Sequence, residues 1–196
     1  MGRLIYTTIA SLDGYVNDSV GRFEWAAPDR EVHSFVNDLE RDVGTYLCGR
    51  RLHEVMVYWQ TVPTDEPEGS EASEDPDDDA VERDYARIWQ AADKVVYSRS
   101  LEAVTGPRTR LETDFDPAAA AALVAAADRD VSIGGPTLAA EALRAGIVDE
   151  LRLLTVPVVV GGGTRTLPDG IRLDLELLEQ RRFAGGTTYA RYAVRR

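Results

Sequence analysis

The chain contains a single cysteine, Cys48, and two histidines, His33 and His53, among its 196 residues. One cysteine excludes an internal disulfide, and so few thiol and imidazole groups disfavour a zinc-type metal site. No apolar run comes near the roughly 20 residues that a membrane-spanning helix needs. The N-terminal segment passes directly into a strand-like pattern without the apolar core of a signal peptide. We therefore expect a cytoplasmic protein that binds no metal ion and does not enter a membrane.

Basic residues are also few: 22 Lys and Arg stand against 34 Asp and Glu, which gives a net charge of −12. No basic stripe is available to neutralise phosphates along a duplex, so we expect no nucleic-acid partner. Nine of the acidic residues lie in the segment "TDEPEGSEASEDPDDDA" (64–80), and the remaining residues carry a net charge of −3. Because this segment lacks large apolar side chains, its composition predicts a disordered surface loop, with a docking segment for a basic partner as the alternative.

Outside that segment, strand-like and helix-like patterns alternate along the chain. Strands are predicted at residues 4–10, 45–49, 93–99, 130–135 and 148–163, helices at 28–43, 50–59, 79–92, 115–130 and 136–146, and a hairpin at 178–194 around Gly185-Gly186. Helix signals support the pattern, since Asp116 and Pro117 are typical of a first turn and Gly146 of a helix end. Such alternation predicts one α/β domain over residues 1–196, with a mostly parallel sheet covered on both faces and an antiparallel hairpin at its C-terminal edge.

Three predicted strand-to-helix junctions carry unusual residues. "CGRRLHE" places Gly49 before Arg50 and Arg51, "YSRSLE" places Ser98 and Arg99 before Ser100, and "IGGPTLA" contains Gly134 and Gly135. In an open α/β sheet, ligands bind beyond the carboxyl ends of the strands, where helix starts offer free N–H groups that suit phosphate. Together the junctions would suit a pyrophosphate and a further phosphate. Each also has a plainer interpretation, as a tight turn, a solvated arginine pair or a surface loop, and the G-x-G-x-x-G fingerprint of an ordinary Rossmann site is absent.

These residues carry a resemblance. The succession "IASLDGYV", "YLCGRRLHEVM", "KVVYSRSL", "VSIGGPTLAAEAL" and "DELRLLTVPVVVGGG" resembles the dihydrofolate-reductase-like superfamily, and most closely the reductase domain of the bifunctional riboflavin-biosynthesis deaminase-reductase. It covers nearly the whole chain outside residues 64–80, and the zinc-binding motifs of the deaminase half are missing. The resemblance implies a three-layer α/β/α fold, NADPH as cofactor, and a homodimer joined through the C-terminal strands.

The resemblance also implies which residues would hold the cofactor. Gly49, Arg50, Arg51 and Leu52 match the family's G-R-x-T motif, although Leu52 replaces the threonine and removes one hydroxyl contact. Ser98 and Arg99 match the junction on the adenosine side, where a positive charge favours a 2′-phosphate. The family's pyrophosphate-facing turn is matched by Gly134, Gly135, Pro136, Thr137 and Leu138.

Fewer residues point to the reacting centre. The segment "SLDGYVND" resembles the loop that closes over nicotinamide and substrate, and Asp13 would orient a substrate or relay a proton there, or else serve only as a turn residue. Trp25 would form a flat wall against a heterocycle or pack in the core. Thr155 matches a position that contacts the pterin in dihydrofolate reductases. His33 and His53 are assigned to packing.

The function implied is an NADPH-dependent reductase of a small pyrimidine- or pteridine-like substrate, by resemblance 5-amino-6-(5-phosphoribosylamino)uracil. Arg165 is a candidate for the substrate's phosphate. One alternative is dihydrofolate reduction, for which Asp29, Glu31 and Asp38 would be the candidate carboxylates on the first helix. The other is a non-catalytic nucleotide-binding module that docks through its acidic loop.

Overall fold

The structure, a computed structural model, describes residues 2–65 and 76–195. An eight-stranded sheet has the strand order β5-β4-β3-β6-β1-β7-β10-β9. Its strands are β1 (Leu4–Ser11), β3 (Val43–Gly49), β4 (Asp93–Tyr97), β5 (Thr109–Glu112), β6 (Asp130–Gly134), β7 (Glu150–Val156), β9 (Asp174–Arg182) and β10 (Thr188–Arg195). The helices are α1 (Arg30–Glu40), α2 (Arg50–Met56), α3 (Pro76–Ala91), α4 (Pro117–Ala126) and α5 (Pro136–Arg144), with short 3₁₀ turns η1 (Glu24–Ala26) and η2 (Val57–Gln60).

Six neighbouring strands, from β5 to β7, run parallel, and β10 and β9 add an antiparallel hairpin at one edge. The register places Ser11 of β1 beside Val156 of β7, and Cys48 of β3 beside Gly134 of β6. The parallel strands therefore end along one edge of the sheet, which is where the sequence placed its candidate residues. The expected mixed α/β sheet with a closing hairpin is confirmed.

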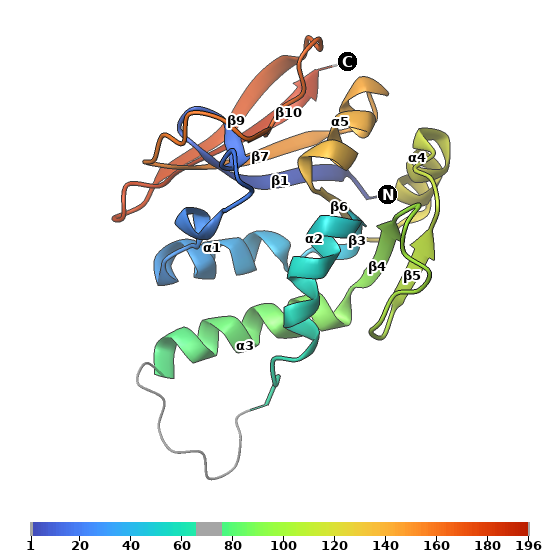
Figure 1. Cartoon of the computed structure of the whole chain (residues 1–196), viewed down its shortest axis with the longest axis horizontal. Helices are drawn as coiled ribbons and strands as arrows, with labels where there is room; N and C mark the ends of the chain where they lie inside the picture. Colours follow the sequence, from blue (N-terminus) through green and yellow to red (C-terminus); the bar gives the residue numbers. More distant parts are fainter. Residues whose placement is uncertain (1, 66–75, 196) are drawn as a thin grey trace.

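Helices cover both faces of the sheet, which makes three layers (Figure 1). On one face, α4 and α5 pack on a core that includes Leu4, Val95 and Ile133. On the other face, α1 and α3 lie side by side and bury aromatic side chains such as Trp89 and Tyr189. Because β-strand side chains alternate between faces, one parallel sheet supplies both cores.

Local sequence signals for helix ends act as expected. The Asp29 carboxylate accepts a hydrogen bond of 2.9 Å from the N–H of Val32 at the start of α1, and Asp116 accepts one of 2.9 Å from Ala118 at the start of α4. Gly146 follows α5 with φ of +67°, a conformation that glycine adopts without strain.

Three predicted elements differ in extent. The strand predicted at 148–163 is β7 and ends at Val156, because Pro157 has no N–H to donate to a ladder and Gly161 begins a run of positive-φ glycines. A small antiparallel ribbon of β2 (Tyr15–Asn17) and β8 (Thr164–Arg165) uses the residues that follow. The edge strand β5 was not predicted.

The acidic segment 64–80 is also partly different from the loop expected. Residues 66–75 lie outside the described part of the chain. The last five residues, 76–80, belong to α3, which begins earlier than predicted. There Arg30 of α1 pairs with Asp77 at 3.1 Å and with Asp78 at 2.5 Å. An arginine on the neighbouring helix thus offsets part of the acidic charge in this first turn.

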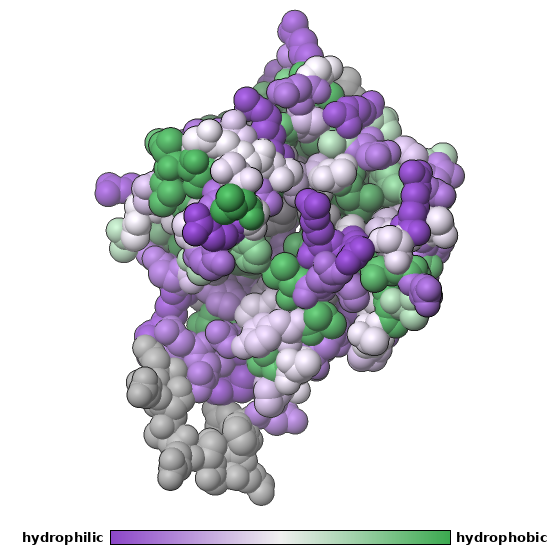
Figure 2. Space-filling model, in the orientation of Figure 1, coloured by the Kyte–Doolittle hydropathy of each residue, from purple (hydrophilic) through white to green (hydrophobic). Residues whose placement is uncertain are grey.

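The visible face of the molecule is mainly hydrophilic, with apolar side chains in separate small groups (Figure 2). Within the described residues, no helix combines the length and the apolar character that crossing a bilayer requires.

Candidate functional site at the carboxyl edge of the sheet

Two of the predicted junctions meet directly. The β3–α2 turn at Gly49 and the β6–α5 turn at Gly134 lie on adjacent strands, and Leu52 of α2 reaches across to the second turn. A Cβ atom at Gly134 would collide with Leu52 Cδ2. The absence of a side chain at residue 134 is thus required by packing within the chain, and the Leu52 side chain closes the approach to the backbone at that point.

The start of α5 stays open next to this contact. Gly135 has φ of +85°, which an L-residue rarely adopts, and Pro136 occupies the first position of the helix. Thr137 is exposed in the first turn, whereas Leu138 is buried in the core. The unpaired N–H groups of this turn are available to an anion, as a helix start allows.

The third junction is organised by hydroxyl groups. Ser98 Oγ accepts hydrogen bonds from the N–H groups of Ser100 at 3.2 Å and of Leu101 at 3.1 Å, which fixes the turn after β4. Arg50 donates to Ser100 Oγ at 3.1 Å and to Glu54 at 2.6 Å, so the first and third junctions are joined by a side-chain contact. Arg99 pairs with Asp114 at 2.5 Å on the exposed surface.

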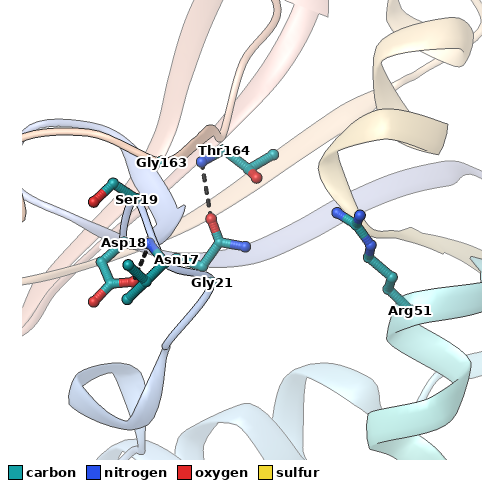
Figure 3. A pocket seen from close by; sticks show the side chains of 8 residues that line it. Asn17, Asp18, Ser19, Gly21, Arg51, Gly163 and Thr164 are labelled. Carbon is teal, nitrogen blue, oxygen red and sulfur yellow. Dashed lines mark hydrogen bonds between the residues drawn. The ribbon is translucent and has the colours of Figure 1, made fainter.

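A pocket of about 570 Å³ opens between α2 and the β2–β8 ribbon. It is lined by Asn17, Asp18, Ser19, Val20, Gly21, Arg51, Gly163 and Thr164. Figure 3 shows the Arg51 guanidinium extending from α2 toward Asn17 and Thr164 on the ribbon. Of these eight residues only Arg51 was predicted from the sequence. The Gly161–Gly163 run and the polar "NDS" after the Asp13-Gly14 turn were the available signals, but nothing in their spacing showed that they pair.

Asp13 holds together the loops beside this pocket. Its carboxylate accepts hydrogen bonds from the N–H groups of Gly161 at 2.7 Å and Val160 at 3.2 Å. The Ser11 hydroxyl, followed by these two N–H groups, lowers the pKa of Asp13 below its ordinary value of 3.8. At neutral pH the group is therefore an anionic acceptor that carries no proton to donate. Its catalytic role stays a prediction.

Three other predicted residues lie beside the pocket without lining it. Trp25 is half-buried in η1, where its indole N–H donates to the carbonyl of Arg22 at 3.2 Å. Thr155 is half-buried in β7, in register with Ala10 and Thr188. Arg165 lies over the Tyr15 ring at 5.3 Å and pairs with Asp169 at 3.7 Å. Their binding roles stay predictions.

The carboxylates of the dihydrofolate-reductase alternative lie elsewhere, in an acidic groove of about 920 Å³ beside α1 and the start of α3. Asp29 caps α1, Glu31 pairs with Arg181 at 3.3 Å, and Asp38 pairs with Arg41 at 3.1 Å. Each carboxylate is thus engaged by a partner within the chain, and none lines the pocket at the carboxyl edge.

The two histidines lie in packed surroundings. His33 contacts the rings of Trp59 and Tyr85, and burial lowers its pKa. Burial also lowers the pKa of His53, which is 8 % exposed. Across residues 2–65 and 76–195, no three His, Cys, Asp or Glu side chains come together in a group that could hold a metal ion.

Comparison with known proteins identifies the family. The sequence matches the model of the RibD C-terminal domain over residues 3–189. The chain belongs to the RibD C-terminal domain family. A RibD-type relative in sequence is YyaP, an uncharacterized protein of Bacillus subtilis (strain 168), which is 25 % identical over 194 residues that cover 97 % of this chain and 94 % of YyaP.

Solved structures share the fold of this RibD C-terminal domain. A Shewanella sp. PV-4 protein, named provisionally as a riboflavin biosynthesis protein, superimposes with a TM-score of 0.72 at 18 % identity and covers 99 % of both chains. A pyrimidine reductase-like protein from Corynebacterium diphtheriae gives 0.64 at 18 % identity over 100 % of this chain and 92 % of its own. The deaminase/5-amino-6-(5-phosphoribosylamino)uracil reductase of Thermotoga maritima gives 0.61 at 13 % identity, and this chain spans 56 % of it. At these identities the likeness shows the fold.

Proposed function

We propose that this chain is an NADPH-dependent reductase that acts on a small pyrimidine-like substrate. One observation carries the proposal: the three predicted junctions converge at the carboxyl edge, where Leu52 of α2 contacts Gly134 and Arg50 bonds to Ser100. Family membership supports the reductase class, because the family is named for the C-terminal domain of RibD. The Thermotoga relative is named as a reductase of 5-amino-6-(5-phosphoribosylamino)uracil, and that compound is the substrate we propose to test first.

The residues at this edge fit a phosphorylated dinucleotide. The open first turn of α5 at Gly135 and Thr137 offers N–H donors, and Arg51 offers a guanidinium that no acidic side chain in the described residues neutralises. Arg50 and Ser98, with Arg99 nearby, would hold the phosphate on the adenosine side. NADPH supplies a hydride when bound, and the chain's own residues bind and orient the reactants.

Asp13 would contribute to the substrate side of this site. Its ionised carboxylate accepts N–H groups from the loop around Gly161, so it fixes the wall against which a substrate would lie. A substrate N–H or hydroxyl group would be oriented by the same acceptor.

The proposal is tested by titrating the purified protein with NADPH and with NADH, following binding by fluorescence, and then by following NADPH oxidation with the aminouracil substrate. We expect saturable NADPH binding that is tighter than NADH binding, and oxidation that requires the substrate. Absence of saturable binding by either cofactor would overturn the proposal. Oxidation with dihydrofolate and not with the aminouracil would move the substrate assignment to the pteridines.

A non-catalytic nucleotide-binding module is the second candidate, and the contacts of Asp13 favour considering it. Because both carboxylate oxygens already accept loop N–H groups, the residue has a structural task without any chemistry. Saturable cofactor binding without turnover on the aminouracil, dihydrofolate or other small heterocycles would support this candidate.

The assembly that we propose is a cytoplasmic homodimer joined at the β9 edge. Leu175 and Leu177 on this edge strand are 36 % and 51 % exposed, and they lie opposite Val194 and Tyr192 on the same face of the hairpin. An unpaired strand edge flanked by apolar side chains suits a second copy of the same edge. Sedimentation at micromolar concentration should give a dimer that Leu177→Glu converts to monomer. A wild-type monomer would contradict this assembly.

A further inference from the structure

Arg51 differs from the arginines that surround it at the carboxyl edge. It makes no ion pair with any residue that the structure describes, although it is exposed at the pocket between α2 and the β2–β8 ribbon. Its neighbours are all engaged: Arg50 with Glu54, Arg99 with Asp114, Arg22 with Asp18 and Arg165 with Asp169. The pocket therefore presents one guanidinium whose charge is left for a ligand.

The opposite wall of the pocket presents hydrogen-bond donors. Asn17 Oδ1 accepts the N–H of Thr164 at 2.8 Å, which fixes the amide so that its NH₂ group is turned to the gap (Figure 3). The Thr164 hydroxyl faces the same gap. Among the described residues neither the Asn17 NH₂ group nor the Thr164 hydroxyl has a hydrogen-bond partner. Both groups can donate to an oxygen of a ligand.

The single carboxylate that lines the pocket does not oppose an anion there. Asp18 Oδ1 accepts the N–H groups of Val20 and Arg22, each at 2.9 Å, and Oδ2 pairs with the Arg22 side chain at 3.1 Å. The backbone N–H of Arg22 is the main cause that lowers the pKa of Asp18. Because its charge is balanced by Arg22, the pocket as a whole keeps the positive charge of Arg51.

The ribbon that forms this wall is fixed before any ligand binds. Gly163 has φ of +137°, and a Cβ atom there would collide with the carbonyl oxygen of Asn17. Asn17 and Thr164 are also paired in the ladder between β2 and β8. Preorganised donors lose little conformational entropy when they bind, so the geometry favours a specific ligand over a diffuse ionic contact.

We propose that this pocket binds a phosphoryl group, held by Arg51 on one side and by the Asn17 amide and the Thr164 hydroxyl on the other. The tetrahedral oxyanion accepts charge-assisted bonds from the guanidinium and further bonds from neutral donors. The proposed function offers two sources, the diphosphate of the dinucleotide or a phosphate ester on the substrate, and only this choice of source rests on that function. The pocket volume of about 570 Å³ leaves room for either.

The test is a titration of the full chain with two probes, inorganic pyrophosphate and ribose 5-phosphate, by calorimetry. The variants are Arg51→Gln and Thr164→Val, with Arg172→Gln as a control because it removes the same charge at an exposed position that pairs with Asp174. We expect saturable binding of at least one probe, weakened about tenfold or more by Arg51→Gln and about threefold by Thr164→Val. The control variant should bind as the wild type does. The side-chain amide resonances of Asn17 should shift with the probe in the wild type and stay unshifted in Arg51→Gln.

The outcomes separate this site from the reductase proposal. An Arg51 effect on pyrophosphate alone assigns the site to the cofactor, and one on ribose 5-phosphate alone assigns it to the substrate. Failure of both probes to saturate, or equal affinity in Arg51→Gln and Arg172→Gln, would overturn the anion site. Arg51-dependent binding in a protein that never oxidises NADPH would leave the site standing and remove the reductase. Thr164→Val keeps the backbone N–H that Asn17 accepts, so the ribbon is preserved in this variant.

Discussion

The side chain of Leu52 occupies the space that a Cβ atom at Gly134 would need. This contact joins the helix after β3 to the turn after β6, and it gives the Gly-Gly sequence a role inside the folded chain. The second glycine has a different requirement, because Gly135 adopts φ of +85° and has only Leu52 Cβ nearby, at 3.7 Å. Two adjacent glycines are thus needed for two separate physical reasons, close packing at one and backbone conformation at the other.

The first prediction concerns this pair. Gly134→Ala should lower the free energy of unfolding by about 1 to 3 kcal/mol, because the new methyl group forces the Leu52 side chain to move in a packed region. Leu52→Ala should recover most of that loss in the double variant, since it removes the opposing atoms. Urea unfolding of the wild type, both single variants and the double variant measures the coupling.

The neighbouring glycine provides the control. Gly135→Ala should cost about 1 to 3 kcal/mol through backbone strain, and Leu52→Ala should not relieve it. Equal rescue at both positions would show that side-chain packing alone governs the turn, contrary to this interpretation.

The second prediction concerns Asp13. Replacing it with Ala removes the acceptor for the N–H groups of Val160 and Gly161, so these two amides should exchange with solvent faster. In an enzyme the change should lower kcat more than it weakens NADPH binding. Because the folded-state pKa is depressed, the loop contact is fully present above pH 3.8 and is lost as the pH falls through the lower folded value. Unchanged exchange and unchanged kcat would leave Asp13 as a solvated turn residue.

The third prediction concerns Lys94, which is 1 % exposed and donates to the carbonyls of Trp89 at 3.1 Å and Ala92 at 2.9 Å. Burial lowers its pKa from 10.5 to about 8. Between these two values the unfolded chain binds more protons, so the free energy of unfolding should rise with pH from about 8 toward 10. Lys94→Met should flatten that rise in urea unfolding series at pH 7.5, 8.5 and 9.5. An unchanged slope in this variant would assign the rise to other groups.

The fourth prediction concerns Glu40, which is 3 % exposed at the end of α1. Burial raises the pKa of its carboxyl above 4.5, against the opposing attraction of Arg152. The folded state therefore keeps a proton that the unfolded chain releases, and stability falls as the pH rises from 4.5 through the folded value. Glu40→Gln should be more stable than the wild type at pH 7 and should lose that advantage near pH 4. Arg152 keeps Glu150 at 2.7 Å and the Leu39 carbonyl at 2.8 Å in the variant, so no other charge is left unpaired. Lower stability at pH 7 would show that attraction to Arg152 outweighs burial.

The fold was readable from the sequence wherever the signal was local. Asp116 with Pro117, Gly146, and Gly185-Gly186 each mark an element end through the chemistry of a few consecutive residues, and each lies where it was predicted. The strand β5 (Thr109–Glu112) was missed because "TRLE" is short and mostly polar, and its extended form depends on pairing with β4. The predicted strand at 148–163 was too long because the apolar run continues past Pro157, where the ladder with β1 has already ended.

The site was readable only in part. Arg51 follows a glycine at a strand end, and this local pattern placed it at the carboxyl edge. Asn17 and Thr164 carried no comparable pattern, because their roles depend on a ribbon between two loops that are distant in the sequence. Leu52 was expected only to lack a hydroxyl, and its contact with Gly134 follows from the packing of α2 against the next strand.

The sequence by itself determined the alternation of helices and strands, the caps and turns, and which edge of the sheet would carry the arginines and glycines, because these depend on propensities and on the parallel order of strands. Only the tertiary structure decided which arginine remains without an acidic partner and which donors face it. Ion pairing depends on distances between segments that the chain brings together only when it folds.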